Sequence, residues 1–134
     1  MSQQEIEEGE SLRLDFGRFH GRDGTGVVPV AVQDAETMQV LLIAHVSQKA
    51  LDETLRTGLA TFFSISRGEL WVKGATSGNT LKVEEIRVNC EQNSLLYVVR
   101  LQAGGACHTK DRDGEYRLGC YYRKIADGKL VLID

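Results

Sequence analysis

The chain of 134 residues carries a formal net charge of −3 and is 42% hydrophobic and 26% charged, which is the composition of one ordinary globular domain. No stretch gathers enough lysine and arginine to bind nucleic acid, and the longest apolar runs are too short to span a bilayer. We therefore expect neither a nucleic-acid partner nor a membrane partner. Three cysteines, an odd number with no secretion signal before them, favour a reducing compartment, so the cytoplasm is expected.

The first elements are an acidic tail and a hairpin. Residues 1–11 carry almost no apolar side chains, which predicts a disordered or weakly helical tail ahead of a single domain over 12–134. Two runs rich in β-branched residues, 27–33 and 39–46, flank the turn-forming residues 34–37. This pattern predicts two antiparallel strands joined by a short loop.

One principal helix is expected next, followed by a series of short strands. Ser47 is a residue type that caps helix N-termini, and Gly58 provides a stop. The residues that fall near helical spacing are Ala50, Leu51, Leu55 and Leu59. Turn-forming residues then separate six strand-like segments, which are 60–66, 69–73, 80–88, 94–101, 119–125 and 129–133. The order predicts an α+β fold dominated by antiparallel sheet, or a small barrel.

The cysteines are the first candidates for chemistry. Cys90, Cys107 and Cys120 are separated by 16 and 12 residues, which matches no structural zinc pattern and includes no Cys-x-x-Cys pair. Three thiolates can hold Zn²⁺ and leave a fourth tetrahedral position open for water, as hydrolytic zinc requires. The alternative is that the cysteines are small buried apolar side chains. His108 could act as a general acid or base near neutral pH, or be a surface residue.

The segment 64–79 is a candidate phosphate-binding region. It combines hydroxyl side chains, two cations and three glycines around one tryptophan. Exposed backbone amides, hydroxyls and a guanidinium group are the groups that bind phosphate oxygens. The alternative is a pair of solvent-exposed turns around a strand.

A second metal is suggested by three alternating side chains next to the first cysteine. In an extended strand Asn89, Glu91 and Asn93 would project from one face. Their oxygen atoms are of the kind that Mg²⁺ binds, although only Glu91 is charged. The alternative is a strand end that faces solvent.

Several of these segments carry a resemblance to a known family, over about residues 26 to 124. They are the strand 28–34, the Ala50-Leu51 and Thr57-Gly58 pairs, Ser66-Arg67 with Leu70-Trp71, the glycine-rich stretch 73–79, Cys90, the Ala-Cys-His-Thr box at 106–109 and Cys120-Tyr121-Tyr122-Arg123. Together they resemble the phosphoribosyl-AMP cyclohydrolase family of histidine biosynthesis.

The resemblance implies a mainly β subunit in an intertwined homodimer, with zinc held by Cys90, Cys107 and Cys120 contributed from both chains. It also implies hydrolytic opening of the adenine ring of 1-(5-phosphoribosyl)-AMP at the N1–C6 bond, with His108 moving the proton. This phosphorylated nucleotide needs local cations and amide donors on a net-negative protein. The candidates are Arg67, Lys73, Thr76, Ser77, Gly78 and Arg123.

Two departures from the family pattern are visible. The family's Mg²⁺ motif has aspartates where this chain has Asn89, Glu91 and Asn93, so we expect weaker Mg²⁺ binding. Residues 110–118 lengthen the connection between the second and third cysteines, and a polar loop of this kind can extend at small entropic cost. Two alternatives stay open: a paralogue acting on another purine-like heterocycle, and a non-catalytic dimer that binds zinc or a nucleotide.

Overall fold

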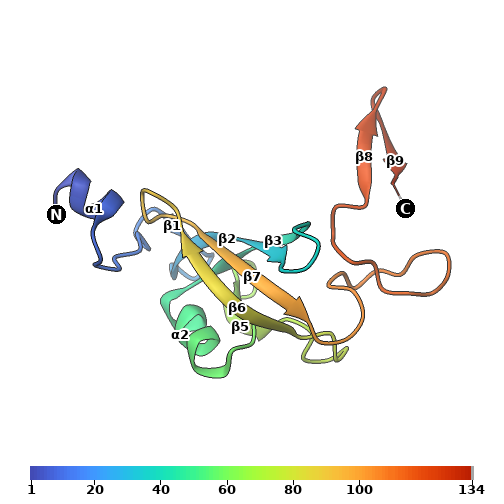
Figure 1. The fold of residues 1–134 in the computed structure, drawn as a ribbon, viewed down its shortest axis with the longest axis horizontal. Helices are drawn as coiled ribbons and strands as arrows, with labels where there is room; N and C mark the ends of the chain where they lie inside the picture. The colour runs from blue at the N-terminus through green and yellow to red at the C-terminus, as the bar shows by residue number, and fades with distance from the viewer. Residues whose placement is uncertain (134) are drawn as a thin grey trace.

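A five-stranded open sheet forms the body of the protein, accompanied by two separate two-stranded hairpins (Figure 1). The computed structural model describes residues 1–133, so the last residue of the expected domain 12–134 lies outside the described residues. The elements in chain order are α1 (Gln3–Glu8), β1 (Phe19–His20), β2 (Gly26–Asp34), β3 (Val40–Val46), α2 (Gln48–Thr57), β4 (Thr61–Ser64), β5 (Glu69–Val72), β6 (Leu81–Val88), β7 (Leu95–Leu101), β8 (Arg123–Ala126) and β9 (Lys129–Leu132).

The sheet is organised around β2. Strands β1 and β3 pair with β2 antiparallel, whereas β7 runs parallel to β2 and pairs antiparallel with β6. The register places Val30 opposite both Ala44 of β3 and Leu95 of β7. The expected α+β class with mostly antiparallel strands is confirmed.

The expected small barrel is wrong, because the central sheet does not close. Within residues 1–133, β4 and β5 pair only with each other. The same holds for β8 and β9. The parallel contact between β2 and β7 was not predicted either. Parallel neighbours require a long crossover, and here the intervening chain carries α2 and the β4–β5 hairpin.

The core lies where β2, β7, α2 and β4 meet. Val28, Val30 and Val32 alternate along β2 and have no exposed surface, as expected for a strand with one face on the core. The Phe62 ring of β4 stacks on Tyr97 of β7, with 6.1 Å between the ring centroids. This packed body fixes the ends of the strands, and most of the candidate residues lie in the loops that leave those ends.

The principal helix begins and ends as predicted. The Ser47 hydroxyl accepts a hydrogen bond from the Ala50 amide at 3.1 Å, and Gly58 closes α2 in the left-handed conformation with a φ of 77°. Leu55 is exposed, although it follows the same helical spacing as the buried Ala50 and Leu51, and Thr54 is buried. Neither helix of the described residues is long or apolar enough to cross a membrane.

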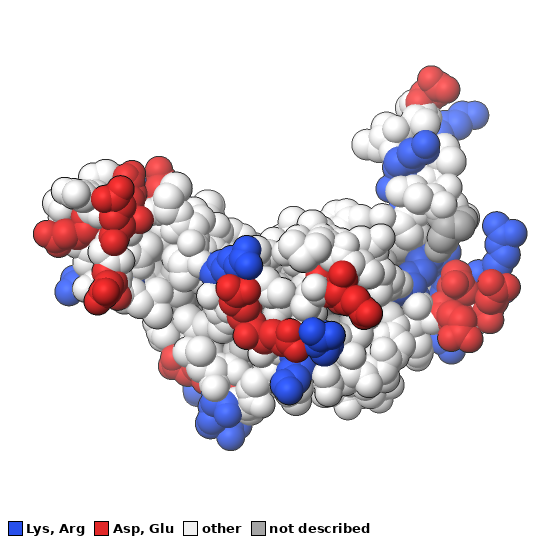
Figure 2. Space-filling model, viewed as in Figure 1, with Lys and Arg blue, Asp and Glu red and all other residues white. Residues whose placement is uncertain are grey.

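The N-terminal tail has more structure than expected. Residues 3–8 form the short helix α1, which Ser2 caps and in which no side chain is buried. The chain then runs back toward the turn between β6 and β7, where it makes specific hydrogen bonds. Acidic side chains gather at this end of the molecule (Figure 2).

The C-terminal hairpin, β8 with β9, projects from the body and is called the arm below (Figures 1 and 2). Ile125, Leu130 and Leu132 of the arm expose 82%, 60% and 54% of their surface. The strand predicted over 119–125 begins only at Arg123, because the Cys120 amide donates to the Leu41 carbonyl of β3 and holds that part of the chain against the body. The arm therefore presents these apolar side chains mostly to solvent.

Candidate functional site

Two of the three cysteines, Cys107 and Cys120, lie side by side. Each thiol shifts the pKa of the other, so the two lie near one another, although Cys107 is buried and Cys120 is exposed. The Cys107 sulfur also lies 2.9 Å from the Thr109 hydroxyl and accepts from the Thr109 amide at 3.4 Å. The Ala-Cys-His-Thr box thus forms a local donor set around one sulfur, which favours the thiolate that binds metals.

A short ladder of backbone hydrogen bonds brings these cysteines together. The Ala106 amide donates to the Leu118 carbonyl at 2.9 Å, and the Cys107 amide donates to the Arg117 carbonyl at 3.1 Å. Gly105 lies against the same segment, and a Cβ added to it would overlap the carbonyl group of Arg117. Glycine at this position is what allows the two segments to approach.

The longer connection between the two cysteines folds back on itself. Lys110 and Tyr116 form an isolated antiparallel bridge, and the Asp111 amide donates to the Glu115 carbonyl at 2.9 Å. The extra residues 110–118 are therefore accommodated in a hairpin-like turn. The cysteines that flank this turn remain adjacent.

The two thiols have different proton affinities. Burial raises the pKa of Cys107, but hydrogen bonds from Thr109 and Cys120 and the charge of Lys73 outweigh it, so the pKa is lowered. The pKa of Cys120 is raised to about 11, first by partial desolvation and then by the neighbouring Cys107 thiolate. The two thiols therefore titrate as an interacting pair, and a divalent cation would compensate the charge of two thiolates.

Cys90 lies far from this pair within the subunit. It follows β6 in the turn before β7, whereas Cys107 follows the other end of β7 (Figure 1). With seven residues, β7 separates the two positions by roughly 20 Å. Accordingly, residues 1–133 contain no group of three His, Cys, Asp or Glu side chains that could hold a metal ion.

Two other candidate groups accompany the cysteine pair. Lys73 lowers the pKa of both thiols through its charge, which places its ammonium group near them. Its Nζ atom also lies 5.9 Å from the centroid of the Trp71 ring. His108 follows Cys107 directly and is exposed, so its imidazole is accessible to a ligand from solvent.

Asn89, Glu91 and Asn93 do come together, but in a turn rather than in the extended strand expected. The Asn89 amide donates to Asn93 Oδ1 at 2.6 Å, and the Asn93 amide donates to Glu91 Oε2 at 3.3 Å. Asn89 Oδ1 accepts the backbone amides of Asn93 and Ser94 at 2.8 and 2.9 Å. Each of the three side chains thus already has an oxygen atom engaged within this cluster.

The candidate phosphate-binding residues fall into three places. Thr76, Ser77 and Gly78 are exposed in the loop that follows Lys73, after the end of β5. Arg67 lies in the turn at the opposite end of β5 and pairs with Glu69 at 3.7 Å. Arg123 lies at the base of the arm. A single subunit therefore does not unite these candidates in one site.

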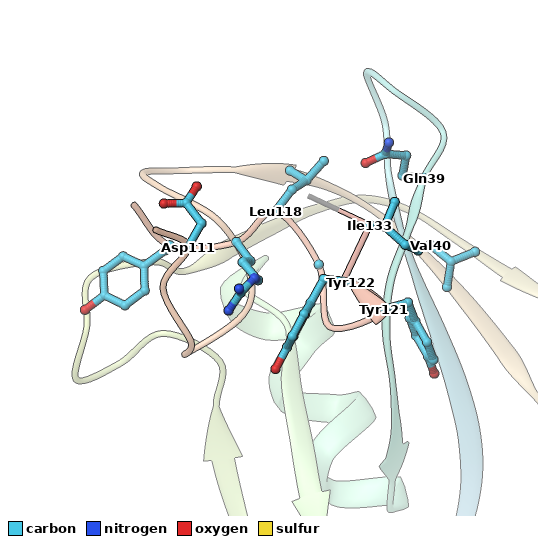
Figure 3. A pocket seen from close by; sticks show the side chains of 10 residues that line it. Gln39, Val40, Asp111, Leu118, Tyr121, Tyr122 and Ile133 are labelled. Atoms are coloured by element: carbon cyan, nitrogen blue, oxygen red, sulfur yellow. The ribbon is translucent and has the colours of Figure 1, made fainter. Parts of the chain in front are cut away.

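A hollow of about 490 Å³ opens beside Cys120. Figure 3 shows Gln39 and Val40 from the start of β3, Asp111 from the hairpin-like turn, and the rings of Tyr121 and Tyr122 around it. Arg117 lies over the Tyr122 ring at 4.0 Å from its centroid. The hollow thus has aromatic, cationic and acidic groups, but no cysteine sulfur lines it.

Sequence reasoning missed three contributors to this region. Thr109 belongs to the Ala-Cys-His-Thr box, and a hydroxyl two residues after a cysteine was the available signal. Gly105 has the local signal of a turn residue, which does not indicate its close approach to Arg117. Gln92, which is 6% exposed, has the local signal of a turn residue, but nothing near it in the chain indicates its partners close to the N-terminus.

Comparisons with known proteins identify the family. The family model described as phosphoribosyl-AMP cyclohydrolase matches residues 42–121. The chain belongs to this family. Proteins named phosphoribosyl-AMP cyclohydrolase from Halobacterium salinarum and Hyphomonas neptunium are each 48% identical, over 88% and 81% of this chain and 86% and 77% of their own length. One from Salinibacter ruber is 49% identical over 76% of this chain and 75% of its own length.

These matches confirm the resemblance seen in the sequence motifs. The family is one of hydrolases. The matched range includes all three cysteines, His108 and Lys73. It ends before Arg123 and the arm.

Proposed function

We propose that this cyclohydrolase opens the adenine ring of 1-(5-phosphoribosyl)-AMP at the N1–C6 bond, in histidine biosynthesis, with zinc held by cysteines of two subunits. Family membership supports the reaction and the phosphorylated nucleotide substrate. The observation that carries the zinc proposal is the pairing of the Cys107 and Cys120 thiols beside Lys73. Because free thiols persist in reducing compartments, the enzyme would work in the cytoplasm.

A homodimer would complete the metal site. The cysteine pair supplies two thiolates, and Cys90 of the same subunit is too far away to supply the third. In a two-fold symmetric dimer, Cys90 of each subunit would reach the pair of the other, which gives two equivalent three-thiolate sites. The exposed apolar side chains of the arm support such an association, because apolar surface of this kind is stabilised by burial.

The residues around the pair have separate tasks in this proposal. Zinc, when bound, would supply Lewis-acid activation of water near neutral pH. His108 directly follows Cys107, so its imidazole would accept a proton from the activated water and return it. Lys73 with Thr76, Ser77 and Gly78 would hold one phosphate, and Arg67 and Arg123 would contact the second only where the dimer brings them near.

A turnover assay tests the proposal directly. Purified protein is analysed for zinc and then mixed with phosphoribosyl-AMP, and ring opening is followed by the change in ultraviolet absorbance. We expect one zinc per subunit and turnover that a chelator abolishes and zinc restores. Zinc without turnover at any Mg²⁺ concentration would instead favour the paralogue or the non-catalytic dimer.

We further propose that the Asn89–Glu91–Asn93 cluster does not serve as a magnesium site. Mg²⁺ prefers carboxylate oxygens and an octahedral shell, whereas this cluster has one carboxylate and two amides that donate to their neighbours. Hydrogen bonds between the side chains hold this turn instead. No step of the reaction is assigned to Mg²⁺.

Restoring the carboxylates is expected to create magnesium affinity. The triple variant Asn89→Asp, Glu91→Asp, Asn93→Asp has three carboxylates and no amide donors, so it should bind Mg²⁺ about tenfold or more tightly than the wild type. Isothermal titration calorimetry with MgCl₂ on both proteins measures the difference. Wild-type binding as tight as that of the triple variant would contradict the proposal.

A further inference from the structure

Gln92 joins the turn that carries Cys90 to the N-terminal segment. Its side-chain Oε1 accepts the Arg13 amide at 2.6 Å, and its Nε2 donates to the carbonyls of Ile6 and Ser11, each at 3.1 Å. Its own carbonyl accepts the Asp15 amide at 2.9 Å. Four hydrogen bonds therefore link this one residue to a segment about 80 positions earlier in the chain.

Only a carboxamide fits this arrangement. The Gln92 residue is 6% exposed, so the polar atoms of its side chain have little access to water and need protein partners. The two carbonyls and the one backbone amide around this side chain require two N–H donors and one acceptor on the same planar group. Gln provides these groups and Glu does not. Gln92 also has a positive φ of 54°, a conformation that persists in a non-glycine residue when surrounding contacts hold it.

The N-terminal segment depends on the same contacts. Helix α1 buries no side chain, and Ile6 is its only half-buried residue. Apolar packing therefore contributes little to its position, and the hydrogen bonds to Gln92 provide the main specific attachment of residues 6–13. Figure 1 shows the segment running past the β6–β7 turn at the same end of the molecule.

We propose that Gln92 is a positioning residue that locks the 89–93 turn onto residues 6–15 and so presents Cys90 in the orientation required for zinc. This inference rests on the proposed function, in which Cys90 is a ligand to zinc shared with a second subunit. Cys90 is exposed and two residues from Gln92, so the conformation of the turn sets the direction of its thiol. Hydrogen bonds that orient metal ligands raise metal affinity in this way.

The zinc affinity of the protein tests the proposal. Three variants are compared with the wild type: Gln92→Glu, which is nearly isosteric but removes both N–H donors; a deletion of residues 2–11, which removes the Ile6 and Ser11 carbonyls; and Gln102→Glu, a matched control. Gln102 is exposed, and its side chain donates to the Arg100 carbonyl at 3.4 Å. Competition with a chromophoric chelator gives the zinc affinity, and Co²⁺ substitution reports thiolate ligation by its charge-transfer absorbance.

We expect Gln92→Glu and the deletion to weaken zinc binding about 10- to 100-fold, with reduced thiolate-to-cobalt absorbance, and the Gln102→Glu control to match the wild type. At saturating zinc, KM should stay near the wild-type value in both variants. Wild-type zinc affinity in the deletion variant would overturn the positioning role, even if Gln92→Glu failed to fold. Failure of the wild type to bind zinc would overturn the zinc site itself, and the positioning role with it.

Discussion

A mixture of two inactive variants, Cys90→Ser and Cys120→Ser, is expected to regain about a quarter of wild-type activity when their subunits are exchanged. Random exchange places half of the subunits in mixed dimers. In a mixed dimer one of the two sites receives an intact Cys90 from one chain and an intact pair from the other, while the second site lacks both. Subunits are exchanged under mild denaturation, and turnover and bound zinc are then measured.

The same exchange between Cys107→Ser and Cys120→Ser provides the control. Both variants damage the same half of the site, so every dimer they form lacks a complete set of thiolates and no activity should return. Activity returning in this second mixture, or none returning in the first, would contradict a site shared between subunits. Each variant alone should bind far less zinc than the wild type, because loss of a ligand leaves only two thiolates.

Gly105→Ala is expected to lower the free energy of unfolding by about 3 kcal/mol and to abolish zinc binding. The new Cβ would overlap the backbone carbonyl of Arg117, and a backbone group cannot move aside as a flexible side chain can. Separation of the two segments would break the hydrogen bond from the Cys107 amide to the Arg117 carbonyl and move the thiols apart. Chemical denaturation and zinc analysis measure the two effects.

The neighbouring glycine offers a matched control for this change. A Cβ at Gly104 would lie 3.5 Å from the Asn79 side-chain oxygen, which is an ordinary contact. Gly104→Ala should therefore change the free energy of unfolding by less than about 0.5 kcal/mol and leave zinc binding intact. Equal effects of the two substitutions would show that the close approach at Gly105 does not hold the cysteine pair together.

The local elements of the fold were predictable because their signals lie within a few residues. Ser47 and Gly58 bound the helix, and the β-branched runs around residues 34–37 form the expected hairpin. Leu55 follows the helical spacing of Ala50 and Leu51 but is exposed, whereas the buried Thr54 donates its hydroxyl to the Thr61 carbonyl at 3.2 Å. Periodicity indicates a buried face but does not say which neighbour will pack on it.

The sequence by itself determined the principal helix, most of the strands and the motifs of the cyclohydrolase family, including the three thiols. Only the tertiary structure decided that Cys107 and Cys120 form a pair, that Cys90 lies at the other end of β7, and that Gln92 ties the N-terminus to its turn. Capping and side-chain alternation act between neighbours in the chain, so they can be read from short stretches. Contacts between distant residues depend on how the strands pack and on where each strand ends, which no short stretch encodes.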